Sequence, residues 1–277
     1  MSPDEYCQNK AATSGSSFYY SFLFLPPERR RAITALYAFC REVDDVVDET
    51  EDPQMAHTKL AWWRNEIENL FAGKPQHPVT RALAPRLEQF GIIAVRLNEI
   101  IDGMQMDLDP SRYEDFKGLE NYCYHVAGVV GLLAAGIFGY RNPQTLEYAR
   151  NLGLAFQLTN IIRDVGDDAR RNRIYLPMDE LKQFEVPAAD ILNARTSENF
   201  TRLMQFQTQR AHSYYAKAFA ALPAEDRRDQ RAGLIMAAIY RTVLEEVAAD
   251  GFKVLTQRTS LTPMRKLWIA IRTWLKT

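Results

Sequence analysis

Two acidic motifs are the residues of this chain best suited to chemistry. The first is DDVVD at positions 44–48 and the second is DVGDD at positions 164–168. On a helix, residues four positions apart are neighbours on one face, so each motif places its first and last carboxylates together. Like charges at this spacing repel by about 0.2–0.5 kcal/mol per pair on an exposed helix. We therefore expect a cation to lie between the carboxylates.

The ligand set indicates which cation this is. Carboxylates without a His or Cys cluster beside them suit a hard cation, and Mg²⁺ typically binds one or two carboxylates while keeping waters and substrate phosphate oxygens in its shell. The two motifs are therefore expected to form a divided site for Mg²⁺ and a diphosphate group. A solvated acidic face explains either motif alone equally well, but two motifs in similar apolar settings favour the metal site.

Polar residues near the second motif continue its face. Gln157 and Asn160 fall on the same helical stripe as Asp164 and Asp168, whereas the rest of that segment is mainly apolar. Guanidinium groups bind phosphate oxygens with two parallel hydrogen bonds, and several arginines lie near the motifs. Ordinary ion pairing with the aspartates is the alternative for these arginines. The candidate phosphate ligands are Arg41, Arg163, Arg170, Arg171, Arg173 and Tyr175.

Three long segments, in this order, resemble the squalene/phytoene synthase family. They are YAFCREVDDVVD at 37–48, YCYHVAG at 122–128, and the run from QLTN at 157–160 through RIYLP at 173–177. The segment SGSSFYYSF at 14–22, followed by LPP at 25–27, is most similar to the bacterial presqualene diphosphate synthases of hopanoid biosynthesis.

The resemblance implies an all-α, single-domain, isoprenoid-synthase-type helical bundle around a central cavity, spanning residues 1–277. It also implies a Mg²⁺-dependent prenyltransferase that condenses two farnesyl diphosphates head to head to presqualene diphosphate, with release of diphosphate, in squalene and hopanoid biosynthesis. The number of metal ions is left open. By motif position, the implied catalytic residues and metal ligands are Asp44, Asp48, Asp164 and Asp168, with Asn160 as a further ligand. The implied substrate-binding residues are Ser14, Ser17, Arg41, Gln157, Asn160, Arg163, Arg173 and Tyr175.

This chemistry predicts what the rest of the cavity contains. Neutralising a departing diphosphate lets the allylic C–O bond ionise to a carbocation, which must then meet an alkene rather than water. Aromatic ring faces attract cations by about 0.5–2 kcal/mol and do not act as nucleophiles. An ordinary helical core is the alternative for each aromatic residue. We expect a catalytic role for Tyr124 and a cavity wall formed by Phe18, Phe22, Tyr37, Val126, Val130 and Tyr240.

Several other reactions stay open. His125 occupies a position where squalene synthases of the family tend to carry Tyr, which fits an enzyme that stops at the cyclopropyl intermediate, lineage drift, or a structural histidine. The alternatives are phytoene, dehydrosqualene or full squalene synthesis, or a sister enzyme that consumes presqualene diphosphate. NADPH is not expected, although a missing GxGxxG motif decides little. A noncatalytic metal-binding helical membrane scaffold is the alternative from another class.

Composition narrows the setting. The net charge is -1 and basic residues are dispersed, so no nucleic-acid partner is expected. Three widely spaced cysteines predict neither a disulfide framework nor a Cys metal site, and the first residues lack the pattern of a secretory signal. We expect a cytoplasmic enzyme, with farnesyl diphosphate as substrate and downstream isoprenoid enzymes as potential partners.

Helical periodicity recurs at 28–49, 59–72, 119–138, 145–167, 199–221 and 231–249, and strand-like alternation is scarce. The most apolar stretch, 126–139, is shorter than the roughly 20 residues that a membrane span needs, so no transmembrane helix is expected. Residues 264–277 read as a basic amphipathic helix, because Leu267, Ile271, Trp274 and Leu275 share one face. Peripheral binding to the inner face of an anionic membrane is one interpretation, and packing on the domain is the other.

Overall fold

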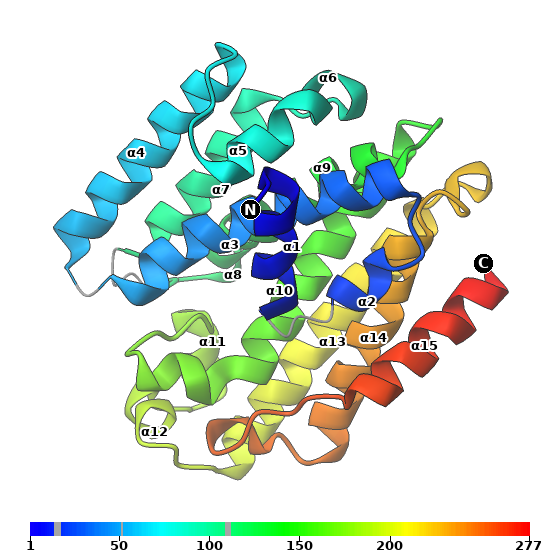
Figure 1. The fold of residues 1–277 in the computed structure, drawn as a ribbon. Coiled ribbons are helices and arrows are strands. Elements are labelled where there is room, and N and C mark those ends of the chain that lie inside the picture. Colours follow the sequence, from blue (N-terminus) through cyan, green and yellow to red (C-terminus); the bar gives the residue numbers. More distant parts are fainter. Residues whose placement is uncertain (14–17, 51, 109–111) are drawn as a thin grey trace.

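The computed structural model describes residues 1–13, 18–50, 52–108 and 112–277. Within these ranges every regular element is a helix, which confirms the expected all-α class (Figure 1). The longer helices are α1 (Pro3–Thr13), α3 (Pro27–Glu49), α4 (Pro53–Phe71), α7 (Ala94–Met106), α10 (Gln144–Arg170), α13 (Glu198–Ala221), α14 (Arg231–Ala249) and α15 (Pro263–Lys276). The shorter ones are α2 (Phe18–Phe22), α5 (Pro78–Leu83), η1 (Ala84–Arg86), α6 (Leu87–Phe90), α8 (Phe116–Cys123), η2 (Tyr124–Gly128), α9 (Val129–Phe138), α11 (Met178–Gln183), α12 (Ala188–Leu192), η3 (Ala224–Asp226) and η4 (Lys253–Leu255).

Helix α3 carries the first acidic motif. It starts at a proline pair, where a missing N–H group is tolerated because the first N–H groups of a helix have no intrahelical partner, and Glu28 in its first turn complements the helix dipole. Leu36, Phe39 and Val43 are fully buried and fix the helix in the core. The motif therefore lies on a rigid element rather than on a loop.

Helix α10 carries the second motif and runs through the middle of the molecule (Figure 1). Small residues let its neighbours approach closely. A Cβ atom at Gly153 would clash with the carbonyl oxygen of Ala127 in η2, and one at Gly131 in α9 would clash with that of Ala149 in α10. Backbone-to-backbone packing of this kind fixes the spacing between α10 and the helix that faces it.

Helices α8, η2 and α9 follow one another without a break from Phe116 to Phe138, and η2 is a π-helical turn. This continuous helix has 23 residues, and an 18-residue window within it has a mean hydropathy of 1.4, so by length and composition it could cross a membrane. The helix is longer than the apolar stretch at 126–139 because α8 extends it toward its N-terminus, and it agrees with the helical periodicity at 119–138. The helix packs against α7 and α10 as a core helix does. Core helices can also be long and apolar enough to cross a membrane.

Two hydrophobic clusters flank the centre of the molecule. One is built mainly from α10, α13 and α14, and the other mainly from α3, α4 and α7. Phe18, Tyr124 and Val126 are partly buried and pack against both clusters. The space between the clusters is the cavity that contains the candidate site.

Candidate active site

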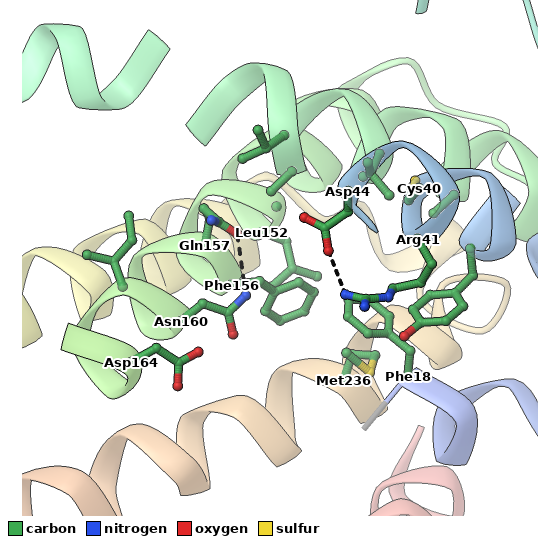
Figure 2. A pocket seen from close by; sticks show the side chains of 18 of the residues that line it. Phe18, Cys40, Arg41, Asp44, Leu152, Phe156, Gln157, Asn160, Asp164 and Met236 are labelled. Carbon is green, nitrogen blue, oxygen red and sulfur yellow. Dashed lines mark hydrogen bonds and ion pairs between the residues drawn. The ribbon is translucent and has the colours of Figure 1, made fainter. Parts of the chain in front are cut away.

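A cavity of about 770 Å³ lies between α3, α10 and the α8–η2–α9 helix. Both acidic motifs and their arginines line one part of it, and most of the remaining lining is apolar. Figure 2 shows Asp44 and Arg41 of α3 facing Gln157, Asn160 and Asp164 of α10. The structure thus brings together carboxylates that are more than a hundred residues apart in the sequence. The apolar part is lined by Phe18, Phe22, Ile33, Leu36, Val126, Val130, Ala134, Phe138, Leu152, Phe156 and Met236, among others.

In the first motif, Asp44 and Asp48 line the cavity and Asp45 does not. Arg41 donates hydrogen bonds to Asp44 at 2.5 Å and to Asp45 at 2.6 Å. Asp45 also pairs with Lys10 of α1 at 2.7 Å, so its carboxylate ties α1 to α3. Burial, followed by the charge of Asp48, raises the pKa of Asp44 to about 6. A raised carboxylate pKa marks a place where added positive charge is favourable.

In the second motif, Asp164 and Asp168 have opposite electrostatic character. Burial disfavours the charge on Asp164, but hydrogen bonds from Arg163 and Arg258 outweigh it and lower its pKa. Among the described residues, none donates a hydrogen bond to the Asp168 carboxylate or forms an ion pair with it. Burial, and then the charges of Asp164 and Asp107, raise the pKa of Asp168 to about 7. Asp168 is therefore the carboxylate with the greatest need for a cation.

The end of α10 connects the two motifs. Asn172 has a positive φ of 59°, and the N–H groups of Asn172 and Arg173 donate to the carbonyl oxygens of Ala169 and Asp168. This is the Schellman pattern that closes helices at a left-handed residue, and Asn tolerates that conformation. The reversal directs Arg173 to Asp48 at 2.8 Å, while Arg171 reaches the other oxygen of Asp48 at 2.9 Å.

Asp107, directly after α7, was missed by the sequence analysis. It lines the cavity and accepts hydrogen bonds from the hydroxyl groups of Tyr122 at 2.7 Å and Tyr175 at 2.9 Å. Burial raises its pKa to about 6, even though both tyrosines favour the charged form. Tyr175, expected to bind diphosphate, thus holds a carboxylate of the cavity wall.

Arg258 was also missed. It lies in the irregular segment between η4 and α15, where no periodicity marks it, yet it lines the cavity and donates to Asp164 at 2.8 Å. Gly166 explains its placement, because η4 packs directly on α10 at this position. A Cβ atom there would lie 2.5 Å from the carbonyl oxygens of both Val254 and Leu255. The glycine within the second motif therefore lets the segment that carries Arg258 approach.

The residues present fit a hard cation. The side-chain oxygen of Asn160 is buried and has no hydrogen-bond partner among the described residues, while its amide nitrogen donates to Gln157 at 3.3 Å. An unpaired buried oxygen near carboxylates of α10 is a suitable Mg²⁺ ligand. The described residues contain no preformed group of three acidic, His or Cys side chains close enough to hold an ion. Metal binding would therefore need the two motifs to adjust.

Most of the residues proposed for the aromatic wall line the cavity. The ring centroid of Phe18 lies 5.7 Å from that of Tyr37 and 6.2 Å from that of Phe22, and all three residues line the cavity. Val126 and Val130 line it as well. Phe156, which the sequence analysis took only as part of the apolar side of its helix, is a further lining residue, 6.4 Å from Phe18.

Two predicted residues, Tyr240 and Tyr124, lie outside the described cavity lining. Tyr240 is buried against Phe156, with ring centroids 4.9 Å apart, and is not among the described lining residues. Tyr124 is also outside this lining, and Arg150 lies 5.3 Å from the centre of its ring. His125 Nδ1 is 2.8 Å from the carbonyl oxygen of Asn121, a contact within its own helix. Ser14 and Ser17 fall outside the described residues.

An apolar cavity with carboxylates and guanidinium groups in one part of an all-helical fold has the chemistry to take a long apolar chain with an anionic head group. The model of the squalene/phytoene synthase family matches residues 11–265, and the chain belongs to this family. Such enzymes are prenyltransferases that act on isoprenoid diphosphates and generally use Mg²⁺. The family predicted from the sequence motifs is thus confirmed.

Individual relatives differ in the product that they are named for. The chain is 37% identical over 279 residues to a phytoene synthase of Arthrospira platensis, an alignment that covers 95% of this chain and 89% of that protein. A dehydrosqualene synthase solved in complex with a ligand has a TM-score of 0.86 at 28% identity, covering 99% of this chain and 96% of the other. A squalene synthase of Alicyclobacillus acidocaldarius has a TM-score of 0.79 at 25% identity, covering 90% and 94%.

Proposed function

We propose that this protein condenses two allylic prenyl diphosphates head to head and releases one diphosphate. The observation that carries the proposal is the single cavity in which both acidic motifs and their arginines adjoin a large apolar volume. Two prenyl chains would lie in the apolar part with their diphosphates at the polar part. Both hydrophobic clusters contribute residues to the cavity lining, which supports treating residues 1–277 as one functional domain.

The chain's own residues have separable tasks in this reaction. Arg41, Arg163, Arg173 and Arg258 would bind phosphate oxygens, because each lines the cavity and presents a guanidinium group. The carboxylates of both motifs and the oxygen of Asn160 would hold Mg²⁺. When bound, Mg²⁺ would neutralise charge on the departing diphosphate. The motifs thereby prepare one allylic C–O bond to break.

The apolar wall controls the fate of the carbocation. Phe18, Tyr37 and Phe156 present rings to the cavity, which stabilise a carbocation and keep water from it. The C1 carbon of the ionised chain bonds to the double bond of the second chain, and loss of a proton closes a cyclopropane that still carries the second diphosphate. No histidine is among the described lining residues, so the released diphosphate is the proposed base.

The curated relative favours phytoene as product, and geranylgeranyl diphosphate is then the proposed substrate. The relative from Arthrospira platensis, which is 37% identical to this chain, is named a phytoene synthase, and its alignment covers most of both chains. Phytoene formation continues from the cyclopropyl diphosphate by loss of the second diphosphate and a further proton, so it consumes no NADPH. This reaction therefore agrees with a chain for which no reductant is expected.

Presqualene diphosphate from farnesyl diphosphate is the second candidate, and a specific observation favours it. Phe22 is 5% exposed, lines the cavity and contacts Phe18 and Tyr37, so a bulky ring occupies volume that a longer prenyl chain would need. The structural similarity to a dehydrosqualene synthase and a squalene synthase agrees with shorter chains. A cytoplasmic location, which the sequence predicts, suits either candidate.

One experiment tests the function and separates the candidates. Purified protein is incubated with Mg²⁺ and either farnesyl or geranylgeranyl diphosphate, with and without NADPH, and products are identified by mass spectrometry before and after phosphatase treatment. Phytoene from geranylgeranyl diphosphate supports the first candidate, whereas accumulation of presqualene diphosphate with or without NADPH supports the second. Squalene that appears only with NADPH identifies a full squalene synthase. Absence of diphosphate release from both substrates, and from added presqualene diphosphate, overturns the proposed function.

A further inference from the structure

Helix α15 turns its apolar face outward. Met264, Trp268 and Leu275 are 80%, 59% and 71% exposed, although each would be expected in a core. The inward face holds the buried residues Ile269 and Ala270 and packs against α14. The exposed apolar residues recur at helical spacing and form one stripe, the α15 stripe, consisting of Met264, Leu267, Trp268, Ile271, Trp274 and Leu275.

Basic residues border the α15 stripe. At 100° per residue, Arg265, Arg272 and Lys276 fall together along one edge of it, and α15 contains no acidic residue. The guanidinium carbon of Arg272 lies 5.2 Å from the centre of the Trp268 ring. Arg265 reaches Glu246 of α14 at 2.6 Å, and no ion pair is found for the other two within the described residues. The edge of the stripe thus carries net positive charge.

We propose that the α15 stripe docks on the surface of an anionic lipid bilayer. An interfacial helix has a continuous apolar face, a row of Lys or Arg beside it, and low overall hydrophobicity, and α15 has each of these features. Tryptophan suits the boundary between headgroups and acyl chains because its ring is apolar while its N–H group still finds a polar partner. Membrane binding is independent of the proposed reaction, since the stripe lies outside the cavity.

The charges favour a bilayer over a second copy of the chain. A two-fold contact through the stripe would place the same surface on both sides and bring the two basic edges into one interface, where like charges repel. An anionic bilayer offers the opposite charge. The stripe also continues onto the α2–α3 turn, where Leu23 is exposed and the Phe24 ring stacks on Trp274 with centroids 5.8 Å apart.

Docking would bring the wall of the cavity close to the lipid. Helix α2 contacts both α14 and α15 and contributes Phe18 to the cavity lining (Figure 1). A product as apolar as a joined prenyl chain leaves more readily into acyl chains than into water. The stripe would therefore hold the enzyme where its product partitions.

Vesicle co-sedimentation of the full chain tests the proposal. Wild type should sediment with vesicles of mixed phosphatidylcholine and phosphatidylglycerol, and the double variant Trp268→Ser/Leu275→Ser should lose at least about tenfold in affinity because it removes two large apolar groups from the contact. Arg272→Gln/Lys276→Gln should lose affinity for the anionic vesicles by about fivefold per cation, with the loss reduced at high salt. Pure phosphatidylcholine vesicles should not distinguish this second variant from wild type.

The matched control is Ile93→Ser/Val95→Ser, which removes two exposed apolar side chains at the start of α7, away from the stripe. It should sediment like wild type. If Trp268→Ser/Leu275→Ser unfolds, the single variants Met264→Ser and Leu275→Ser, at the two ends of the stripe, should each lose about threefold in affinity. Unchanged sedimentation of the folded stripe variants overturns the proposal. So does a wild-type dimer that does not bind vesicles and that the stripe variants convert to a monomer by analytical ultracentrifugation.

Discussion

Arg173 donates a hydrogen bond of 2.8 Å to Asp48, and this contact joins the end of α10 to the first acidic motif on α3. Both residues line the cavity, and the left-handed turn at Asn172 aims the arginine at its partner. The guanidinium group is thus fixed beside the carboxylates instead of lying free on the surface. An arginine side chain held in this way would lose little conformational freedom on binding a phosphate group.

Arg173→Gln should therefore lower kcat/KM for prenyl diphosphate by about 10²–10³-fold, as expected when one preorganised electrostatic group is removed. Steady-state release of diphosphate measures this. The kcat/KM of Arg173→Lys should lie between those of wild type and Arg173→Gln, because lysine keeps the positive charge but not the planar guanidinium group. The control is Arg195→Gln, whose ion pair with Asp190 lies outside the described cavity lining. Activity of Arg173→Gln within about threefold of wild type would remove this arginine from the site.

Mg²⁺ together with inorganic diphosphate should stabilise the folded enzyme against heat. Ligand at about 100 times its dissociation constant contributes about 2.7 kcal/mol, which corresponds to roughly 5–10 °C in Tm for a chain of this size. Asp164→Asn should abolish most of that shift and most of the activity. The control is Asp250→Asn, which removes a carboxylate that pairs with Lys253, and it should keep both. EDTA should remove the shift from wild type. A full shift in Asp164→Asn would show that the second motif does not bind the metal complex.

The two carboxylates of the second motif should respond to pH with opposite sign. The folded-state pKa of Asp168 is about 7 against an ordinary 3.8, so the stability that it contributes is present below pH 4 and is lost as the pH rises through 7. At about 1.4 kcal/mol per unit, this amounts to at most about 4 kcal/mol before solvent screening. Without metal, Asp168→Asn should therefore melt above wild type at pH 8 and close to it at pH 4.

Asp164 supplies the reversed comparison, because its pKa is lowered in the folded protein. Its contribution is present above its ordinary pKa and is lost on acidification, so Asp164→Asn should melt below wild type at pH 8 and approach it at acid pH. Calorimetry at both pH values in EDTA measures each difference. Equal effects of the two substitutions at pH 8 would contradict the opposite electrostatic character of the two sites.

Gly166→Ala should separate η4 from α10. The added methyl group would lie 2.5 Å from two backbone carbonyl oxygens, and backbone cannot rotate away as a side chain can. Overpacking of this kind costs about 1–3 kcal/mol, and we also expect a loss of about tenfold in kcat/KM because Arg258 moves away from Asp164. The control is Gly118→Ala in α8, where the nearest atom lies 3.5 Å away. It should be neutral or stabilising by about 0.5–1 kcal/mol in urea unfolding. Wild-type stability of Gly166→Ala would contradict the close packing.

The sequence was most informative where local periodicity and a motif coincide. The regions around α3 and α10 combine an apolar helical period with carboxylates four residues apart, so both the helices and the cavity-facing residues could be predicted. Helix α7 was not predicted, and this also hid Asp107, which follows its last residue. The sequence does not distinguish an Asp at a helix end from an ordinary solvated residue. The hydrogen bonds from two tyrosine hydroxyl groups to Asp107 arise only in the folded structure.

Arg258 and Tyr240 also depend on tertiary contacts that the sequence does not show: the first was missed, and the second was wrongly placed in the cavity lining. Arg258 joins the site because η4 packs at Gly166, a contact between segments about ninety residues apart that no local pattern encodes. Tyr240 has helical spacing suited to the cavity, but Phe156, whose ring packs against it, is the residue that lines the cavity. Which of two aromatic residues forms the surface of a cavity depends on how two helices are rotated against each other, and a one-dimensional pattern does not contain that angle.

The guanidinium groups already paired with Asp44, Asp48 and Asp164 have a consequence for the order of binding. A lone divalent ion would compete with these arginines for the carboxylate oxygens, and a displaced arginine would be left without an anion. A diphosphate that arrives with its metal offers the displaced arginines new anionic partners at the same moment. We therefore expect the two motifs to exchange counter-ions on binding, so that bound metal would raise the affinity for diphosphate and bound diphosphate would raise the affinity for metal.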